Sequence, residues 1–345
     1  MVGSARGRED LRTRLIGTTT TLLSEETVAD YLQARGLLQD SDRVTVRALG
    51  GGVSNVVLAV LSPRRQLVVK QALPRLRVTE EWFAKKERAV TEGRALSALA
   101  RLSPGSVPAV YDVDEEQCAL TIEAAPAGWR VWKEELLAGR ADAGRAGEVG
   151  RLVGLMHAST HGEEWRSFDD DEAFNQLRVH PYYDTIAARH PDLAAAVGAA
   201  AQEMRERKSC LVHGDCSPKN VLLGPDRLWL IDFEVAHFGD PVFDVAFLLN
   251  HLLLKAIARP RLRGGYAECA VAFLEAYAAA GGAGARDEEY LDLHLGCLLL
   301  ARVDGKSPVE YLDEDGRRRA RAVGRRLLSA RPAERRSPWE LLARR

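Results

Sequence analysis

The sequence predicts an α+β protein of two lobes: an N-lobe built on an antiparallel sheet and a mainly helical C-lobe. Short apolar runs separated by turn residues fill positions 44–72 and 107–123, which is the pattern of antiparallel strands. From residue 131 onward the chain is predicted to be mostly helical, apart from strand-like runs around two polar motifs. A chain of 345 residues is long enough for two lobes with separate cores.

The N-lobe is expected to begin with a helix and to continue into three strands. The run from Ser24 has acids in its first turn followed by an apolar face, as an amphipathic helix does. Residues 44–49, 56–61 and 66–72 are predicted strands, and residues 50–55 form the glycine-rich turn between the first two.

A helix over residues 80–102 and strands over 107–113 and 119–123 complete the N-lobe, and the lobes join near residues 124–128. A basic amphipathic helix is expected near the C-terminus, with Val323, Leu327 and Leu328 on its apolar face. The predicted division is a loosely ordered N-terminus (1–23), the N-lobe (24–126), the C-lobe (127–330) and a basic tail (331–345).

Composition indicates a cytoplasmic globular protein. The net charge of −1 argues against attraction to nucleic acid or to a membrane surface. The five cysteines show no Cys-x-x-Cys spacing, which favours a reduced protein without structural zinc. The apolar run over 242–254 is interrupted by polar residues, so a buried helix is expected there and not a membrane span.

The most informative stretch is Leu-Val-His-Gly-Asp-Cys-Ser-Pro-Lys-Asn at 211–220, followed by Leu-Ile-Asp-Phe-Glu at 230–234. A kinase phosphoryl-transfer centre needs one carboxylate to accept a hydroxyl proton, and an amide with a second carboxylate to hold the metal. Asp215, Asn220 and Asp232 supply these groups in the right order and spacing. The apolar flanks predict short buried strands that present them on loops.

Four neighbouring residues have predicted roles. His213 is interpreted as a scaffold residue that hydrogen-bonds the loop, and Gly214 as a position where a side chain would hinder the backbone. Lys219 either reaches the transferring phosphate or is a solvated surface lysine. Asp244 opens an apolar helix and is expected to accept hydrogen bonds from backbone amides of the catalytic loop.

The N-lobe carries the expected nucleotide-binding groups. Lys70 lies on an apolar strand, where a phosphate ligand and an ion pair with Glu92 would account for a long cation; Glu87 is the rival partner. The glycine-rich turn is predicted to act as a lid whose amides approach phosphate oxygens. Its candidate residues are Gly51, Gly52, Ser54 and Asn55.

Taken together, these residues resemble the aminoglycoside phosphotransferase and choline kinase group, over roughly residues 25–310. The resemblance implies a protein-kinase-like fold, ATP and Mg²⁺ as cofactors, Asp215 as catalytic base, and Asn220 and Asp232 as metal ligands. It also implies that the linker backbone near Ile122–Ala124, with Glu123 at its centre, binds the adenine edge.

A closer resemblance, to 5-methylthioribose kinase, is carried by residues 69–77, 81–82, 87–89, 92, 232–239 and 243–244. It implies that Glu234 helps Asp232 to hold magnesium, as a second carboxylate would. Two features differ from that family. The Ser-Pro-Lys-Asn run at 217–220 is more similar to the antibiotic kinases. Methylthioribose kinases present a pair of arginines to the substrate from a helix of the C-lobe, whereas this chain has only Arg302 in a comparable neighbourhood.

The sequence therefore predicts an ATP- and magnesium-dependent kinase that phosphorylates a hydroxyl of a small molecule. A pentose related to methylthioribose is one acceptor. An antibiotic, either an aminoglycoside or a nucleoside, is the alternative, and acidic clusters at 287–289 and 313–315 are candidates for binding a polycation. A nucleotide-binding pseudokinase would require a missing base or metal ligand, and each is present.

Overall fold

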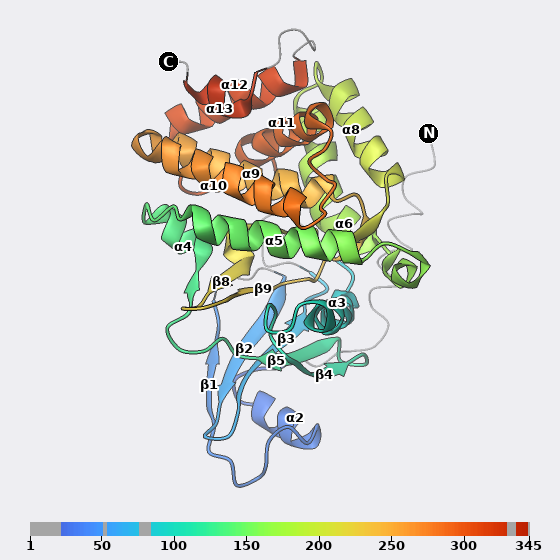
Figure 1. The fold of residues 1–345 in the computed structure, drawn as a ribbon. Helices are drawn as coiled ribbons and strands as arrows, with labels where there is room; N and C mark the ends of the chain where they lie inside the picture. The colour runs from blue at the N-terminus through green and yellow to red at the C-terminus, as the bar shows by residue number, and fades with distance from the viewer. Residues whose placement is uncertain (1–21, 51–53, 76–83, 330–335, 344–345) are drawn as a thin grey trace, which may run out of the picture. The chain divides into compact units, whose positions relative to one another are not determined.

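The computed structural model describes residues 22–50, 54–75, 84–329 and 336–343 (Figure 1). The chain divides into two compact units. The first comprises the residues up to Ser97 together with Pro108–Ala125, and the second comprises Ala98–Val107 together with the chain from Pro126 onward.

The first unit is built on a five-stranded antiparallel sheet, which confirms the fold predicted for the N-terminal region. The strand order is β1-β2-β3-β5-β4. The strands are β1 (Thr45–Ala48), β2 (Asn55–Leu61), β3 (Gln66–Ala72), β4 (Val110–Asp114) and β5 (Ala119–Glu123). Lys70 stands in the central strand β3, opposite Val57 of β2 and Leu120 of β5.

Helix α2 (Val28–Ala34) packs on this sheet through its predicted apolar face. Val28 and Leu32 are fully buried against Leu58, Val60 and other apolar side chains of β2 and β3. The burial of apolar surface, which contributes about 25 cal/mol per Å², is the main source of stability for such a contact.

Helix α3 (Arg88–Leu102) begins later than the sequence predicted. The predicted start at residue 80 lies outside the described residues, but the described residues 84–87 form coil and a turn. The backbone of Ala84 donates to Pro74 O (3.2 Å), and the Arg88 side chain caps the carbonyls of Lys85 (2.7 Å) and Leu73 (3.0 Å). These bonds hold the segment against the end of β3, where helical geometry is not formed.

The second unit is mainly helical, as predicted (Figure 1). Its α-helices are α4 (Trp132–Leu137), α5 (Ala143–Ser159), α6 (Glu172–Phe174), α7 (Thr185–Arg189), α8 (Ala194–Glu206), α9 (Val242–Ala258), α10 (Arg263–Ala279), α11 (Glu288–Asp304), α12 (Glu314–Ser329) and α13 (Pro338–Ala343). A π-helical segment, η2 (Asn175–Asp184), lies between α6 and α7, and short 3₁₀ turns occur at η1 (Glu163–Phe168), η3 (Pro218–Asn220) and η4 (Pro260–Leu262).

Helix α9 lies in the core of this unit and is buried along almost its whole length. It is the buried helix predicted over 242–254. Within the residues that the structure describes, no helix combines the length and apolar character needed to cross a membrane. The predicted amphipathic helix near the C-terminus is α12, which buries Val323, Leu327 and Leu328.

Two small antiparallel sheets carry the polar motifs. One pairs β7 (Cys210–Val212) with β10 (His237–Gly239), and the other has the order β6-β8-β9, formed by β6 (Arg130–Val131), β8 (Val221–Leu223) and β9 (Leu228–Leu230). Strands β7, β8 and β9 are the predicted apolar flanks. Strands β6 and β10 were not predicted, because two or three residues are too few to establish an alternating pattern.

Candidate active site

The catalytic loop begins directly after β7 and is held by Asp244 at the start of α9. The Asp244 carboxylate accepts hydrogen bonds from the backbone amides of His213 (2.7 Å) and Gly214 (2.9 Å), as predicted. It also pairs with Nε2 of the buried His157 (3.1 Å). Burial alone would raise the pKa of Asp244, but these partners hold that pKa below its ordinary value, so the carboxylate stays charged.

Gly214 meets both conditions that the sequence suggested. Its φ of +75° lies in the left-handed region, and a Cβ there would lie 2.7 Å from the carbonyl oxygen of Val235. A side chain would therefore be strained and would clash with backbone. This close approach joins the catalytic loop to the segment that follows Asp232.

His213 has the predicted scaffold role. Its Nδ1 accepts the backbone N–H of Asp215 (3.1 Å), and its Nε2 lies 3.0 Å from the carbonyl oxygen of Ile231. One acceptor and one donor nitrogen define a neutral imidazole, and burial lowers the pKa of His213 accordingly. The ring thus ties the residue before Asp232 to the residue that bears the candidate base.

Asp215 is 2% exposed, and three donors converge on one of its carboxylate oxygens. Oδ2 accepts from Asn220 Nδ2 and lies within ion-pair distance of Arg178 Nη2 and Lys219 Nζ, each at 2.9 Å. No described residue donates to Oδ1. Burial would raise the pKa of Asp215, but Arg178 and Lys219 lower it, so the carboxylate is charged and presents one oxygen for a hydroxyl.

Arg178 is the residue of this cluster that the sequence did not reveal. It lies in the π-helical segment η2, is buried, and donates from Nε to Gly214 O (3.0 Å) and from Nη1 to Leu177 O (2.7 Å). π-helical turns occur often at functional sites. Its guanidinium therefore fixes both the backbone before the base and the carboxylate itself.

Asn220 and Asp232 are brought together by the backbone. The N–H of Ile231 donates to Asn220 O (3.0 Å), so the two predicted metal-binding segments run side by side. Asp232 has a φ of +72°, which is uncommon for a residue other than glycine. Such backbone strain is concentrated at functional sites.

The donor set fits a magnesium ion. Because Asn220 Nδ2 donates to Asp215, the amide is oriented with Oδ1 free of any donor from the described residues. The charges of Asp232 and Glu234 also reach this cluster, since both act to raise the pKa of the buried Arg178. In the described part of the chain no three His, Cys, Asp or Glu side chains form a metal cage. Magnesium in kinases is usually held by one or two carboxylates together with substrate phosphates and waters.

In the first unit, Lys70 pairs with Glu92, the partner favoured over Glu87. The Nζ atom lies 2.7 Å from the Glu92 carboxylate, and both side chains are buried. Arg88, which the sequence did not single out, donates to the carbonyl of Ser54, the residue before β2. Of the predicted lid, Ser54 and Asn55 are described, whereas Gly51 and Gly52 lie outside the described residues.

Two backbone amides of the segment predicted to bind adenine already donate hydrogen bonds within the first unit. The N–H of Glu123 donates to Ala109 O (2.8 Å) and that of Ala124 donates to Gln66 O (3.0 Å). Among the described residues, none accepts from the N–H of Ala125, so this amide is the first one free at the end of β5.

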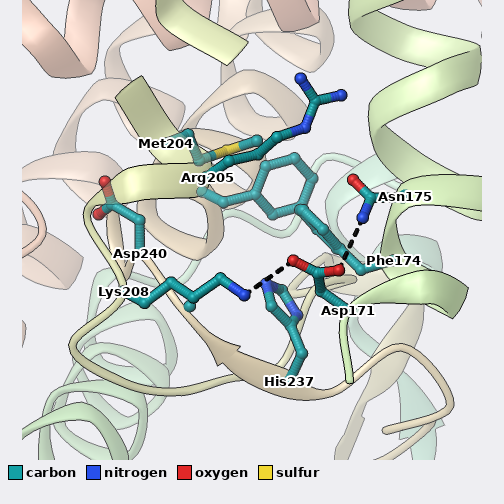
Figure 2. A pocket seen from close by; sticks show the side chains of 10 residues that line it. Asp171, Phe174, Asn175, Met204, Arg205, Lys208, His237 and Asp240 are labelled. Carbon is teal, nitrogen blue, oxygen red and sulfur yellow. Dashed lines mark hydrogen bonds and ion pairs between the residues drawn. The ribbon is translucent and has the colours of Figure 1, made fainter. Parts of the chain in front are cut away.

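Figure 2 shows a small pocket of the second unit. Its lining includes His237 and Gly239 of β10 but not Asp215. Its empty volume is about 270 Å³, part of it open to solvent. Lys208 and Asn175 Nδ2 both bind Asp171 (2.9 and 2.8 Å), and Asp240 accepts from Tyr290 Oη (2.8 Å). The two carboxylates of the lining, Asp171 and Asp240, therefore already have donor partners within the protein.

The convergence of Asn220, Arg178 and Lys219 on Asp215, with Asp232 beside them, has the chemistry of a phosphoryl-transfer centre. Residues 45–290 match the model of the phosphotransferase enzyme family, and the chain belongs to that family. It is therefore a phosphotransferase that acts on a hydroxyl acceptor.

Individual relatives support this assignment. The chain is 28% identical to a methylthioribose kinase of Bacillus cereus over 268 residues, which cover 69% of this chain and 67% of that protein. A choline/ethanolamine kinase family protein from Mesorhizobium loti shares the fold, with a TM-score of 0.52, 16% identity, and coverage of 92% of this chain and 98% of its own. An amicoumacin kinase solved with AMP-PNP and Ca²⁺ also has a TM-score of 0.52, at 15% identity, covering 97% of this chain and 93% of its own. The predicted protein-kinase-like fold is confirmed.

Proposed function

We propose that this protein transfers the γ-phosphate of ATP to a hydroxyl of a sugar-like small molecule, with Mg²⁺ held by Asn220, Asp232 and Glu234. The observation that carries the proposal is the Asp215 carboxylate: three donors contact its Oδ2, while Oδ1 receives none from the described residues. A fixed, charged acceptor of this kind orients a hydroxyl and takes its proton.

In the proposed reaction the acceptor hydroxyl donates its hydrogen bond to Asp215 Oδ1. The hydroxyl oxygen bonds to the γ-phosphorus, the bond from that phosphorus to the β–γ bridging oxygen breaks, and ADP leaves with its electron pair. The proton passes to Asp215. Bound magnesium neutralises phosphate charge.

The first unit is assigned the nucleotide. Lys70, oriented by Glu92, is assigned to the α- and β-phosphates. The Ser54–Asn55 turn is assigned to the phosphates and the N–H of Ala125 to the adenine edge.

A pentose of the methylthioribose type is the first acceptor to test, because the chain is 28% identical to a methylthioribose kinase over 268 residues. The aminoglycoside alternative has less support. Asp287 caps α11 by accepting from Tyr290 N (3.0 Å), and Asp313 accepts from Gly316 N (2.7 Å). The acidic clusters at 287–289 and 313–315 thus start helices and need no polycation to explain them.

The test is transfer of labelled γ-phosphate to methylthioribose, other pentoses, nucleosides, choline and aminoglycosides by the wild-type protein and by Asp215→Asn. We expect Asp215→Asn to lower kcat by about a hundred- to ten-thousandfold while ATP affinity, measured by calorimetry, stays nearly unchanged. Asp226→Asn, at an exposed turn, is the matched control. Undiminished turnover by Asp215→Asn would refute the assignment of the base.

A further inference from the structure

Lys255 of α9 is a buried cation without a carboxylate partner. It is 1% exposed, its Nζ donates to His251 O one turn earlier (3.2 Å), and it lies 5.4 Å from the centre of the Tyr311 ring. No carboxylate of the described residues forms an ion pair with it. Burial, with the charges of Lys133 and Arg302, lowers the pKa of Lys255 to about 7. A buried ammonium is costly unless it loses its proton or gains a counter-charge.

Two more polar groups beside it lack partners. Arg302 uses Nη1 on Tyr182 Oη (3.2 Å) and Ser307 Oγ (2.8 Å), but its Nε is buried without an acceptor among the described residues. The buried Oη of Tyr311 likewise has no partner in that part of the chain. Buried polar atoms are nearly always hydrogen-bonded. An ammonium, a guanidinium N–H and a phenol together are donors suited to an oxyanion.

A series of contacts links these groups to the candidate base. Phe247, His251 and Lys255 occupy positions i, i+4 and i+8 on one face of α9. Arg178, which contacts Asp215, lies 5.9 Å from the Phe247 ring, and that ring lies 5.2 Å from His251. Eight helical residues rise about 12 Å. One face of α9 therefore leads from the ring that contacts Arg178 to Lys255.

The charge around this face is mainly positive. Burial and the charges of Lys255, Arg302, Lys219 and Lys133 hold the pKa of His251 well below its ordinary value. Two carboxylates are engaged with these cations, Glu310 with Lys133 (2.6 Å) and Asp215 with Lys219 (2.9 Å). Arg302 and Lys255 retain no carboxylate among the described residues. A polycationic acceptor would meet like charge here.

We infer that Lys255 and Arg302 bind an anionic group of the acceptor, so that the substrate is a hydroxylated small molecule bearing a carboxylate or a phosphate. This inference rests on the proposed function, because it takes Asp215 as the point where the acceptor's hydroxyl is held. It narrows the acceptor class, since neutral pentoses and polycationic antibiotics lack the counter-charge that Lys255 requires.

The first test compares phosphate transfer to D-ribose and methylthioribose (neutral), D-ribonate (carboxylate), D-ribose 5-phosphate (phosphate) and kanamycin (polycation). We expect kcat/KM for an anionic acceptor to exceed that for D-ribose at least about tenfold, and the two anionic arms to identify which oxyanion is bound. Lys255→Met should remove this preference, mainly by raising KM. Lys208→Met, at a lysine paired with Asp169 and Asp171, should leave it intact. A preference for a neutral or cationic acceptor, or one unaffected by Lys255→Met, would overturn the inference.

The second test measures binding without turnover. Calorimetry with D-ribonate and with D-ribose 5-phosphate at about pH 8, in buffers of different ionisation enthalpy, should show uptake of up to about one proton by the wild-type protein. An anion beside Lys255 would raise the pKa of that lysine, which otherwise is mostly neutral at this pH. Proton uptake should vanish in Lys255→Met. Lys255→Arg should still bind the anionic probe, but without proton uptake.

The two tests separate the two claims. Binding of an anionic probe with proton uptake, but without phosphate transfer to any acceptor, would refute the kinase proposal and support the anion site. Phosphate transfer to neutral acceptors, with neither anionic probe bound by the wild-type protein, would support the kinase proposal and refute the anion site. If Lys255→Met does not fold, proton uptake by the wild-type protein decides alone.

Discussion

Lys70 and Lys255 are both buried lysines, 8% and 1% exposed, yet their surroundings differ. Lys70 stands in the central strand of the first unit with the Glu92 carboxylate 2.7 Å away. Lys255 stands in the core helix of the second unit, where the groups around it are Lys133, Arg302, a tyrosine ring and one carboxylate, Glu310, that is bound elsewhere.

The difference indicates how each lysine is used. The Glu92 carboxylate supplies a counter-charge to Lys70 within the protein, which suits a lysine assigned to a polyphosphate ligand. Lys255 carries a charge that depends on pH and on what is bound. The protein itself supplies the counter-charge of Lys70, whereas a bound anionic ligand supplies that of Lys255.

The largest expected effect is that of breaking the complete pair. Lys70→Met should lower the free energy of unfolding by about 3–5 kcal/mol, because the buried Glu92 carboxylate would lose its ion pair with Lys70. It should also reduce kcat/KM for ATP far more than KM for the acceptor. Urea unfolding and steady-state kinetics measure the two effects. The double variant Lys70→Met with Glu92→Met should recover stability without recovering activity. Recovered activity would refute the assignment of Lys70 to the nucleotide site.

Lys255→Met, the corresponding change in the second unit, should raise the free energy of unfolding. The pKa of Lys255 falls from 10.5 to about 7 on folding, so the unfolded chain binds more protons between these values and stability rises with pH there. The cost is fully present below about pH 7. Lys255→Met should therefore stabilise the fold by about 1–4 kcal/mol at pH 6, with a smaller gain at pH 9. Destabilisation at both pH values would mean that the ammonium has a partner in the fold.

The sequence was sufficient for the residues whose roles depend on local spacing. Asp215, Asn220 and Asp232 lie in two short motifs flanked by apolar strands, and Glu92 follows Lys70 on the next helix, so order and spacing alone placed them in candidate roles. The structure brings Asp215 and Asn220 into contact and pairs Lys70 with Glu92.

Arg178 could not be found in this way. It lies 36 residues before the loop carbonyl that it contacts, in a polar stretch without a motif, and its π-helical setting has no sequence signature. Lys255 did leave a signal: helical spacing puts it on the face of Phe247 and His251 at the end of an apolar run. The sequence could not show that no described carboxylate pairs with Lys255, because this depends on how α11 and the segment after it pack.

Removing the cation that fixes Asp215 should alter a pH profile more than stability. Arg178 lowers the pKa of Asp215 against the effect of burial, so Arg178→Met should raise that pKa. The acidic limb of the kcat–pH profile should then move to higher pH by about 1–2 units, with kcat about tenfold lower at its maximum. Arg178→Lys, which retains the charge and loses the Gly214 contact, should keep the limb in place. Equal shifts in both variants would make Arg178 a packing residue only.

The smallest expected effect belongs to Lys219, for which the sequence left two roles open. Its Nζ binds Asp215 Oδ2, yet its side chain is 52% exposed, so solvent screens the pair and its removal should hardly change stability. The proposed function places the developing charge of the transferred phosphoryl group beside this lysine. Lys219→Ala should lower kcat about three- to tenfold with the unfolding midpoint unchanged, and Lys219→Arg should retain most of the rate. Because Arg178 remains on the same oxygen, the acidic limb should move less than in Arg178→Met; a larger shift would make the exposed cation, and not the buried one, the group that sets the charge of the base.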